Sequence, residues 1–507
     1  METLSSHKLS AVEAMRRQEW KRAVAALESA LQEDPGWVEG WLNLGLCWLR
    51  LKEASSAIRA LEQGLQLDPA RPRVRLSLAD ACVLAGNSVR AEAWCREECE
   101  RFPDQISSWL ALGLSQERRG EGEAEIAYRR AYSLAPNDPS TLWNLGRWLQ
   151  ENHRLEEAQA ILHSGSLQHP SVGRLQWQWT VNCFLRGDWT TGLRQLDSRW
   201  LAPDFPRGPQ WNSIPLWAQG EAPRSPIFVE PEQGFGDTLQ FVRFVPPLVA
   251  QGHRVWLGVP KALEPLLTGG LPVEQILTDP QKALGAGCRI PIMSLPARLG
   301  IQGDALDGAP YLSIPCAIRS ESRLSGAKRL RIGVVWRGNP EHRNDRRRSI
   351  PIGDLMPLFQ LPDVEWVSLQ LGALGVEDLA QLRGLGVSIR DGASGIRHFQ
   401  DTAQEVLSTD LVVTVDTSIA HLAGALGHPV CTLLPYYPDW RWALRGDVTP
   451  WYRSMRLFRQ TIQNSWESPV KRLCDFLRAY TETGRDPIFG ETARGQGERR
   501  EQIRVGL

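Results

Sequence analysis

The sequence lacks the features that would place this chain across or beyond a membrane. It contains no run of about 18 apolar residues, the length that a membrane-spanning helix requires. Its opening residues, METLSSHKLSAVEAMRRQEW, lack the apolar core of an export signal. We therefore expect a cytoplasmic protein without a membrane span.

An excess of charge and a paired set of cysteines are also missing. Lysine and arginine number 58, as do aspartate and glutamate, so the balance predicts neither nucleic acid nor an anionic membrane as a partner. The nine cysteines form no C-x-x-C pair, and no second pair follows Cys95 and Cys99. We expect no metal site, no disulfide and a reducing compartment.

What the sequence does contain is an internal repeat. Prolines recur at intervals of 34, 34, 33 and 34 residues, at Pro35, Pro69, Pro103, Pro136 and Pro170. Ten residues after each proline stand Gly45, Ala79, Gly113, Gly146 and Thr180. Twelve residues before each proline stand Ala23, Ala57, Ala91, Ala124 and Ala158.

This pattern predicts pairs of closely packed helices. Small residues at a fixed phase let two helices cross closely, and a proline ends the second helix because it cannot continue the hydrogen-bond ladder. The period is typical of tetratricopeptide repeats, and we predict an α-solenoid of about five repeats with terminal helices over 1–204. The groove of this array would hold a peptide or partner protein. Alternatively, the array serves only as a spacer or as a dimerisation surface. The sequence does not determine the oligomeric state.

The second half of the chain alternates between strand-like and helix-like segments. After a proline-rich stretch at 201–217 come PIFVE, RVWLGV, QILTD and CRIPI, with helical segments between. A polar stretch at 315–330 precedes a second series whose strands are RIGVVW, VEWVSLQ, VSIRD, LVVTV and VCTLLP. Such alternation predicts parallel sheets covered on both faces. We predict an α/β region of two Rossmann-like lobes, at 205–325 and 326–485, with a cleft between them and a mobile tail at 486–507.

The stretch EQGFGD follows the first of these strands. We predict that Gly234 and Gly236 let the backbone turn tightly, so that Asp237 falls in the first turn of the next helix. A carboxylate there caps the helix, which is the simpler interpretation. It is also well placed for a general base at the mouth of the cleft.

Two further stretches carry groups suited to a phosphate. WRGNPEHRNDRRRS holds Arg337, Arg343, Arg346, Arg347 and Arg348. Such a run is usually a solvated surface, but at the end of a buried strand it supplies cations to a diphosphate. TVDTSIAH brings Asp416, Thr417 and Ser418 to a helix start that suits a phosphate, with His421 on the same helical face as Thr417, either as a ligand or as a packed side chain.

The last such stretch, LLPYYPDWRWAL, follows the final predicted strand. It contains Tyr436, Asp439, Trp440, Arg441 and Trp442. The aromatic faces and the arginine can cover a nucleobase or a sugar, or they can pack the edge of the lobe. The sequence favours neither interpretation.

The stretches EQGFGDTLQFVRFVP, GVVWRGNPEHRNDRRRSIP and VDTSIAHLAGALGHPVCTLLPYYPDWRW together resemble bacterial tetratricopeptide proteins that are fused to a glycosyltransferase domain. That domain is similar to the ADP-heptose heptosyltransferases of glycosyltransferase family 9, over about 210–460. The resemblance implies a compact two-lobed glycosyltransferase-B fold. The lobe at 205–325, which would bind the acceptor, is shorter than in free-standing heptosyltransferases.

The resemblance also implies a role for each site residue. Asp237 matches the acidic residue that acts as catalytic base, and Arg348 matches a basic residue, often lysine, that contacts the donor phosphates. Asp416, Thr417 and His421 match a D-T-x-x-x-H donor motif, with serine where glycine is common. The donor side would comprise Gly234, Gly236, Arg337, Arg348, Asp416, Thr417, Ser418 and His421.

The hypothesis that results is a metal-independent glycosyltransferase with a nucleotide-sugar substrate and no cofactor. The repeat groove suggests a protein or peptide acceptor. Two alternatives stay open. One is a non-catalytic repeat scaffold with a degenerate transferase domain, and the other is a transferase that acts on a lipid-linked or surface glycan.

Overall fold

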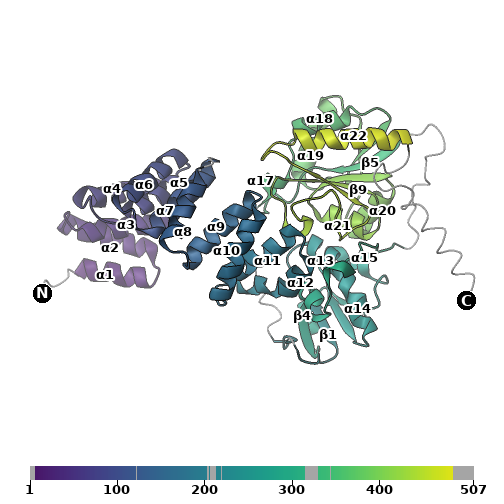
Figure 1. Ribbon diagram of the computed structural model, residues 1–507, viewed down its shortest axis with the longest axis horizontal. Coiled ribbons are helices and arrows are strands. Elements are labelled where there is room, and N and C mark those ends of the chain that lie inside the picture. The colour runs from purple at the N-terminus through teal and green to yellow at the C-terminus, as the bar shows by residue number, and fades with distance from the viewer. Residues whose placement is uncertain are drawn as a thin grey trace, which may run out of the picture. The chain divides into compact units, whose positions relative to one another are not determined.

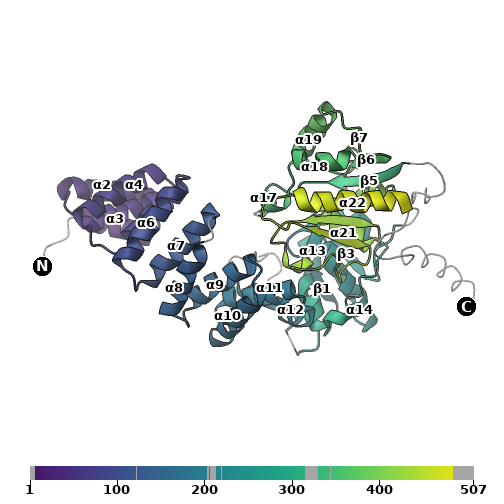
Figure 2. The ribbon, with the colours of Figure 1, turned by 45° about the horizontal axis from the view of Figure 1, so that its top comes forward.

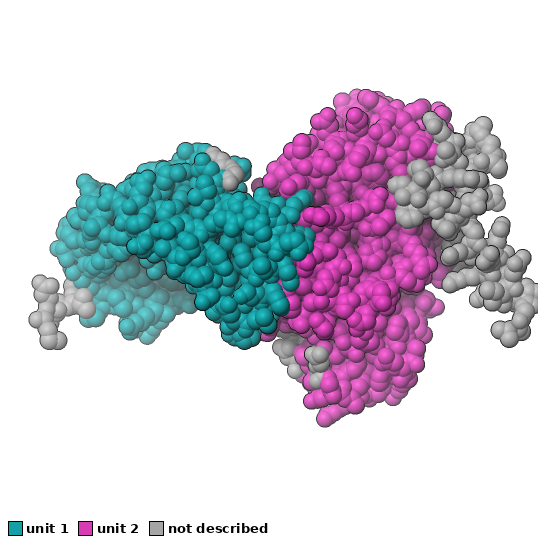
Figure 3. Space-filling model, in the orientation of Figure 1, with its two compact units in different colours: residues 1–178 teal, residues 179–507 magenta. Residues whose placement is uncertain are grey.

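The computed structural model describes residues 6–120, 123–202, 205, 213–218, 220–314, 329–342 and 344–483. The chain divides into two compact units, residues 1–178 and 179–507, which are coloured differently in Figure 3. Arg343, the tail at 486–507, residues 315–328 of the polar stretch and most of residues 203–212 lie outside the described part. The predicted boundaries at 204, 325 and 485 stay predictions.

About twelve helices form the N-terminal repeat array, and the division between the two units falls within α11 (Figure 1). The helices are α1 (Ser6–Arg16), α2 (Trp20–Glu33), α3 (Val38–Arg50), α4 (Ala54–Leu67), α5 (Val74–Leu84), α6 (Ser88–Arg101), α7 (Ile106–Arg119), α8 (Ala124–Leu134), α9 (Pro139–Glu151), α10 (Leu155–Gln168), α11 (Gly173–Arg186) and α12 (Trp189–Gln195). The predicted helical repeats are confirmed.

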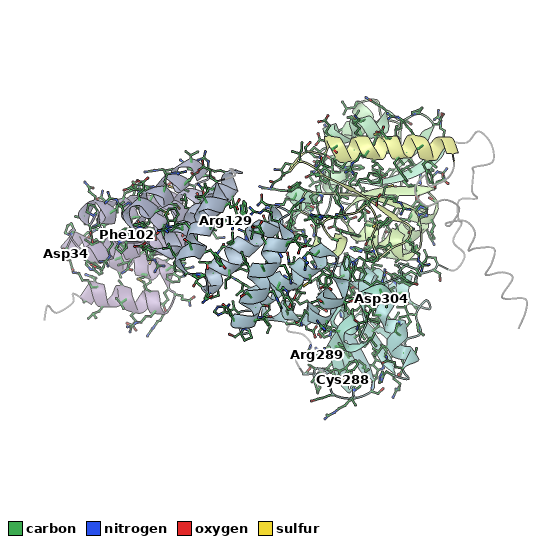
Figure 4. The ribbon with its side chains drawn as sticks, viewed as in Figure 1. Asp34, Phe102, Arg129, Cys288, Arg289 and Asp304 are labelled. Carbon is green, nitrogen blue, oxygen red and sulfur yellow. The ribbon has the colours of Figure 1, made fainter. Side chains whose placement is uncertain are left out.

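Each proline of the repeat follows the end of a helix by two residues, at α2, α4, α6, α8 and α10. The residue directly before each proline lies outside the helical region, with φ between −145° and −127° and ψ between 64° and 85°. The proline ring excludes the helical conformation at that position, so the sequence itself ends these helices. Asp34 and Phe102, two of the residues concerned, are labelled in Figure 4.

The small residues of the repeat lie where paired helices cross. A β-carbon on Gly113 of α7 would lie 2.6 Å from the ring of Tyr128 on α8, and one on Gly146 would meet Leu162 in the same way. The alanines twelve residues before the prolines are wholly buried: Ala23, Ala57, Ala91, Ala124 and Ala158. A larger side chain at these positions would push the helices apart, as the spacing predicted.

The second unit contains two sheets whose strands are all parallel. The first sheet has the order β3-β2-β1-β4. Its strands are β1 (Ile227–Glu230), β2 (Val255–Gly258), β3 (Gln275–Leu277) and β4 (Cys288–Pro291), with helices α13 (Phe235–Phe241), α14 (Val245–Ala250), α15 (Glu264–Leu267) and α16 (Leu295–Arg298). The short 3-10 turn η1 (Leu196–Leu201) precedes this sheet, and η6 (Ile292–Ser294) follows β4.

The second sheet has the order β10-β9-β8-β5-β6-β7. Its strands are β5 (Leu330–Val335), β6 (Val364–Ser368), β7 (Ile389–Asp391), β8 (Leu411–Val415), β9 (Val430–Leu434) and β10 (Met455–Arg459). Its helices are α17 (Asp345–Arg348), α18 (Ile352–Phe359), α19 (Ala373–Gly384), α20 (Phe399–Leu407), α21 (Ser418–Ala425) and α22 (Glu467–Thr483). The turn η8 (Trp440–Trp442) follows β9.

Helices cover both faces of this second sheet. Alternate residues of its strands, among them Ile332, Val413 and Leu433, pack with α18 and α22 in one apolar core. In Figures 1 and 2, α22 runs along one side of the sheet and α21 lies on the other. The strand predictions made from the sequence match β1 to β9, whereas β10 and α22 were not predicted. Across the described part of the chain, no helix is both long and apolar enough to cross a membrane.

Candidate functional site

The residues predicted for the cleft follow strands β1, β5, β8 and β9. β1 lies between β2 and β4, and β5 lies between β6 and β8, so each sheet reverses its direction of growth there. Ligands of open parallel sheets bind at the carboxyl ends of strands beside such a reversal. The structure therefore places the stretches that contain Asp237, Arg348 and Asp416 at the edges where ligands are expected.

Helices α13 and α21 bring these two sheet edges together, because they pack against each other. A β-carbon on Gly236 would lie 2.9 Å from Cδ2 of His421 and 3.8 Å from Cα of Ser418. The expectation that the two glycines make the turn is wrong: Gln233 takes the left-handed conformation, with φ 49°, whereas Gly234 has φ −99°. Gly236 is needed for the close approach of the two helices instead.

Asp237 has two partners in the structure. Its Oδ2 accepts a hydrogen bond from the backbone N–H of Gly234 at 2.9 Å, so the predicted cap of α13 is present. Its Oδ1 forms an ion pair with Nη2 of Arg441, a residue of η8. The side chain is only 13% exposed. The role of Asp237 as a base stays a prediction.

Arg441 is the centre of a buried charged cluster. Its Nη1 donates to Oδ1 of Asp439 at 2.8 Å, and its Nε donates to Oε1 of Gln240 at 2.9 Å. Burial alone would lower the pKa of Arg441, but the carboxylates of Asp439, Asp237 and Asp416 raise it above its ordinary value. The guanidinium is therefore charged, and it links α13 to the loop after β9.

Arg348 contacts the 416–421 segment. Its Nη1 donates to the backbone carbonyl of Asp416 at 2.9 Å, and its Nε donates to Oδ1 of Asp345 at 3.2 Å. A β-carbon on Gly338 would collide with both the Arg348 guanidinium and the Asp345 carboxylate. Gly338 thus leaves the room in which Arg348 reaches the end of β8.

The remaining arginines of the run make different contacts. Arg337 forms an ion pair with both carboxylate oxygens of Asp378 on α19, and its Nη2 lies 3.2 Å from Oδ1. Arg346 and Arg347 are exposed, as expected of a solvated surface. None of the contacts found for Arg337 joins it to the cluster around Arg441.

Asp416 sits between these cationic groups. Burial and the carboxylate of Asp439 raise the pKa of Asp416 to about 6, and the Arg348 and Arg441 guanidinium groups oppose that rise. The charge of the cluster therefore changes just below neutral pH. Within the described residues, no three histidine, cysteine, aspartate or glutamate side chains gather closely enough to hold a metal ion.

The start of α21 has the form that the sequence predicted. Thr417 is the residue before the first helical turn, and its Oγ1 accepts a hydrogen bond from the N–H of Ile419 at 3.3 Å. Oγ1 of Thr417 also lies 3.1 Å from Oγ1 of Thr414. Ser418 is the first residue of the helix. Their contact with a donor stays a prediction.

His421 is a packed residue in this structure, 4% exposed. Its Nδ1 lies 2.9 Å from Oη of Tyr452, and its ring stacks on Trp442 with 5.1 Å between centroids. Burial lowers the pKa of His421 well below its ordinary value, and Arg441 and Arg243 lower it further. The imidazole is therefore neutral.

The two tryptophans after β9 also belong to the core, whereas Tyr436 is half-buried. Trp440 and Trp442 are 7% and 1% exposed. Trp440 packs on Phe184 with 4.3 Å between centroids, and the Arg441 guanidinium lies 4.2 Å from its ring centroid. These contacts favour packing over the alternative that both indole faces cover a nucleobase.

Sequence reasoning missed a buried charge network at the end of β1. Glu232 accepts hydrogen bonds from Nε and Nη2 of Arg199 at 2.9 and 2.8 Å, and from the N–H of Met293 at 2.9 Å. Arg199 belongs to η1 and is wholly buried. The letters EPE at 230–232 signal two carboxylates beside a sheet edge, but no pattern around Arg199 points to its partner.

Glu230 is the second carboxylate of that network. Its Oε1 accepts a hydrogen bond from Nη1 of Arg289 at 2.7 Å, and Arg289 is labelled in Figure 4. In the described part of the chain its buried Oε2 has no hydrogen-bond partner. Burial raises the pKa of Glu230 to about 7; Arg289 opposes the rise and Glu232 adds to it.

A second candidate site is a hollow in the repeat array, with a volume of about 530 Å³. Helices α3, α5 and α7 supply most of its wall, and the larger apolar side chains are Leu42, Leu46, Leu61, Val74, Leu76, Val83 and Leu114. Asp80, Arg73 and Arg118 add charge to the lining. Tetratricopeptide repeats suggest peptide or protein binding, and this hollow has the apolar wall that such a ligand needs.

Comparison with known proteins identifies the array. The model of the tetratricopeptide repeat family matches residues 9–72 and 53–106, so these N-terminal helices are tetratricopeptide repeats. Protein FlbA of Caulobacter vibrioides is 22% identical over 475 residues, which cover 88% of this chain and 74% of FlbA. The peroxisomal targeting signal receptor of Kluyveromyces lactis is 26% identical over 198 residues, which cover 32% of this chain and 35% of the receptor.

Two more distant similarities concern shorter stretches. The human protein O-mannosyl-transferase TMTC1 is 25% identical over 145 residues, 27% of this chain and 16% of that protein. The crystal structure of MamA aligns with a TM-score of 0.30 at 18% identity, and the alignment covers 33% of this chain and 97% of MamA.

Proposed function

We propose that the second unit is a glycosyltransferase of the glycosyltransferase-B type, similar to the family 9 heptosyltransferases. An acceptor hydroxyl or amide would attack the anomeric carbon of a nucleotide sugar and form the new glycosidic bond. Oδ1 of Asp237 would take the acceptor's proton. The bond between the anomeric carbon and the donor phosphate oxygen would break, and the nucleoside diphosphate would leave with that electron pair.

The observation that carries this proposal is the packing of α13 against α21 at the carboxyl ends of β1 and β8. Two parallel sheets that each reverse their order at this point are what two Rossmann-like lobes supply. Asp237 then stands on one edge, and Arg348, Asp416 and Thr417 stand on the other. A donor held there would have a base on one side and positive charge on the other.

Each predicted donor residue has a role in this proposal. Arg348 would form charge-assisted bonds to the diphosphate, and Thr417 and Ser418 would present the start of α21 to it. Asp416 accepts the hydrogen bond from Arg348 that positions the guanidinium. Gly234 and Gly236 shape the approach of α13 to α21. His421 would not contact the donor but holds α21 in place through its contacts with Tyr452 and Trp442. Arg337 would contact the donor only after its ion pair with Asp378 breaks.

The acceptor is proposed to be a protein or peptide that the repeat array engages. The hollow between α3, α5 and α7 offers an apolar wall for such a chain. Two similar proteins carry names that agree with the two halves of the proposal, a targeting signal receptor and an O-mannosyl-transferase. An acceptor glycan, lipid-linked or on a surface, would make the array an assembly element instead.

The decisive test is Asp237→Asn in the full chain, with sugar transfer measured from labelled UDP-, GDP-, ADP- and dTDP-sugars. Asn caps a helix about as well as Asp but cannot take the proton, and a base contributes about 10²–10⁴-fold in rate. We expect turnover to fall at least about a hundredfold. Turnover close to wild type would leave Asp237 as a helix cap and ion-pair partner of Arg441, without a role as base.

Asp401 provides a control for the helix-capping role of Asp237. Its Oδ2 accepts hydrogen bonds from the N–H groups of Arg397 and His398 at 2.9 and 3.2 Å, so it caps α20 as Asp237 caps α13. Asp401→Asn should keep turnover close to wild type. An equal loss in both variants would assign the effect to helix capping.

The donor and the metal requirement are tested separately. A nucleotide sugar present at ten times its Kd stabilises the protein by about 1.4 kcal/mol, which a thermal-shift screen detects. Because Arg348 and the start of α21 supply positive charge, we propose turnover without a metal ion. Turnover that EDTA abolishes and Mg²⁺ or Mn²⁺ restores would contradict this.

A non-catalytic scaffold is the second candidate, and the ion pair between Asp237 and Arg441 favours it. A carboxylate that only caps a helix and joins two elements needs no substrate. In that case no nucleotide sugar binds, and the chain still binds partner proteins through the array. The thermal-shift screen separates the two candidates.

A further inference from the structure

The proposed base is not free in this structure, because Arg441 holds it. Oδ1 of Asp237 is paired with Arg441, whereas Oδ2 receives the N–H of Gly234. The oxygen that would take the acceptor's proton is therefore the oxygen that the guanidinium covers. The two residues lie 204 positions apart, and their side chains are 13% and 10% exposed.

The charged groups around this pair would repel an incoming diphosphate in the arrangement that the structure shows. Arg441 forms ion pairs with Asp237 and Asp439, and the carboxylate of Asp416 is close enough to raise the pKa of Arg441. Arg348 is held by a neutral carbonyl and one carboxylate. Four carboxylates and two guanidinium groups carry a net negative charge, which repels an anion unless a guanidinium turns toward it.

We propose that Arg441 is a ligand of the donor diphosphate that leaves Asp237 when the donor binds. This inference rests on the proposed glycosyltransferase function and adds a residue to it. A diphosphate offers an arginine several oxygens in a fork geometry, and a doubly charged anion competes well with one carboxylate. The exchange frees Oδ1 of Asp237 while Gly234 still orients the side chain, so donor binding exposes the base.

Inorganic pyrophosphate tests the exchange without a known donor. Its affinity for the full chain is measured by calorimetry in wild type, Asp237→Asn, Arg441→Gln and the double variant. If Asp237 competes with the anion for Arg441, Asp237→Asn binds pyrophosphate about tenfold more tightly than wild type. Arg441→Gln binds pyrophosphate at least about tenfold more weakly than wild type. The double variant binds it with the same affinity as Arg441→Gln, because the competition needs Arg441.

The double variant separates competition from a general loss of negative charge. A gain from Asp237→Asn that persists in the Arg441→Gln background, or no gain at all, overturns the inference. Arg441→Lys keeps the charge but not the fork, so it should bind with intermediate affinity; it replaces Arg441→Gln if the latter does not fold. Wild-type affinity in Arg441→Lys and Arg441→Gln alike also overturns the inference.

Arg348→Gln distinguishes this inference from the proposed function. Binding that is lost in Arg348→Gln but unchanged by both Arg441 variants keeps the donor site and removes Arg441 from it. If pyrophosphate binds neither wild type nor any variant, Asp237→Asn included, the donor site and the exchange are both refuted.

Discussion

The two units of the chain differ in where several of their ion pairs lie, at the surface in the first unit and in the interior of the second. Several ion pairs of the first unit join residues 28 to 30 positions apart, such as Arg129 with Glu157, and these two side chains are 43% and 47% exposed. In the second unit, Arg199 pairs with Glu232 and Arg441 with Asp237, and all four side chains are 13% exposed or less. Buried pairs also occur in the first unit, where Arg75 lies 3.7 Å from Glu98.

The difference shows where the chain can tolerate the loss of a charge. An exposed pair gains little free energy because water and salt screen it. A buried pair is costly to break, since the partner that remains is an uncompensated charge in a poorly solvated place. The array should therefore be stabilised by its period of small and apolar residues, and the second unit should depend on a few individual ion pairs.

The largest effect is expected at Arg199. Arg199→Met removes the partner of the buried Glu232 carboxylate, which should reduce the free energy of unfolding of the second unit by about 3–5 kcal/mol. Chemical denaturation followed by tryptophan fluorescence measures it. Arg254, an exposed residue that pairs with Glu274 in the same unit, is the matched control, and Arg254→Met should leave the midpoint in place.

The same pair bears on the predicted boundary at 204. A fragment of residues 205–485 lacks Arg199, whereas a fragment of residues 179–485 retains it. We expect the longer fragment to unfold cooperatively at a clearly higher denaturant concentration. Equal midpoints would show that η1 contributes nothing to the sheets and that the boundary at 204 is correct.

A smaller effect, dependent on pH, is expected at Glu230. Its pKa is raised to about 7, so the folded state binds a proton more tightly than the unfolded state and loses stability as pH rises toward 7. Relative to Glu230→Gln, wild type should gain about 2 kcal/mol of unfolding free energy between pH 8 and pH 5. A difference between the two proteins that does not change with pH would contradict a buried, neutral Glu230.

The smallest effect is expected at Arg129, which is labelled on α8 in Figure 4. Arg129→Met removes two exposed pairs, with Glu125 at 2.6 Å and Glu157 at 2.8 Å. Pairs of this kind contribute about 0.2–1 kcal/mol each, and less in salt. A loss in the first unit as large as that of Arg199→Met would remove the contrast between the units.

Much of the fold could be predicted because its signals are local. The prolines exclude helix at the residue before them, the five buried alanines keep one phase, and strands β1 to β9 are short apolar runs. The candidate site could be predicted only as four stretches at strand ends. Asp237 as a cap and Thr417 at a helix start follow from positions next to a strand, whereas only the family resemblance singled out Arg348 among the arginines after β5.

The sequence by itself determined the repeat, the ends of its helices, the parallel strands and the places where polar groups leave them. Each of these depends on backbone sterics or on an apolar period within a few residues of chain. Only the tertiary structure decided that Arg441 covers Asp237 across 204 residues, that Arg199 neutralises Glu232, and that Gly236 serves contact with His421. Such pairings depend on how the helices and sheets pack, and they leave no periodic trace in the sequence because each joins single residues far apart along the chain.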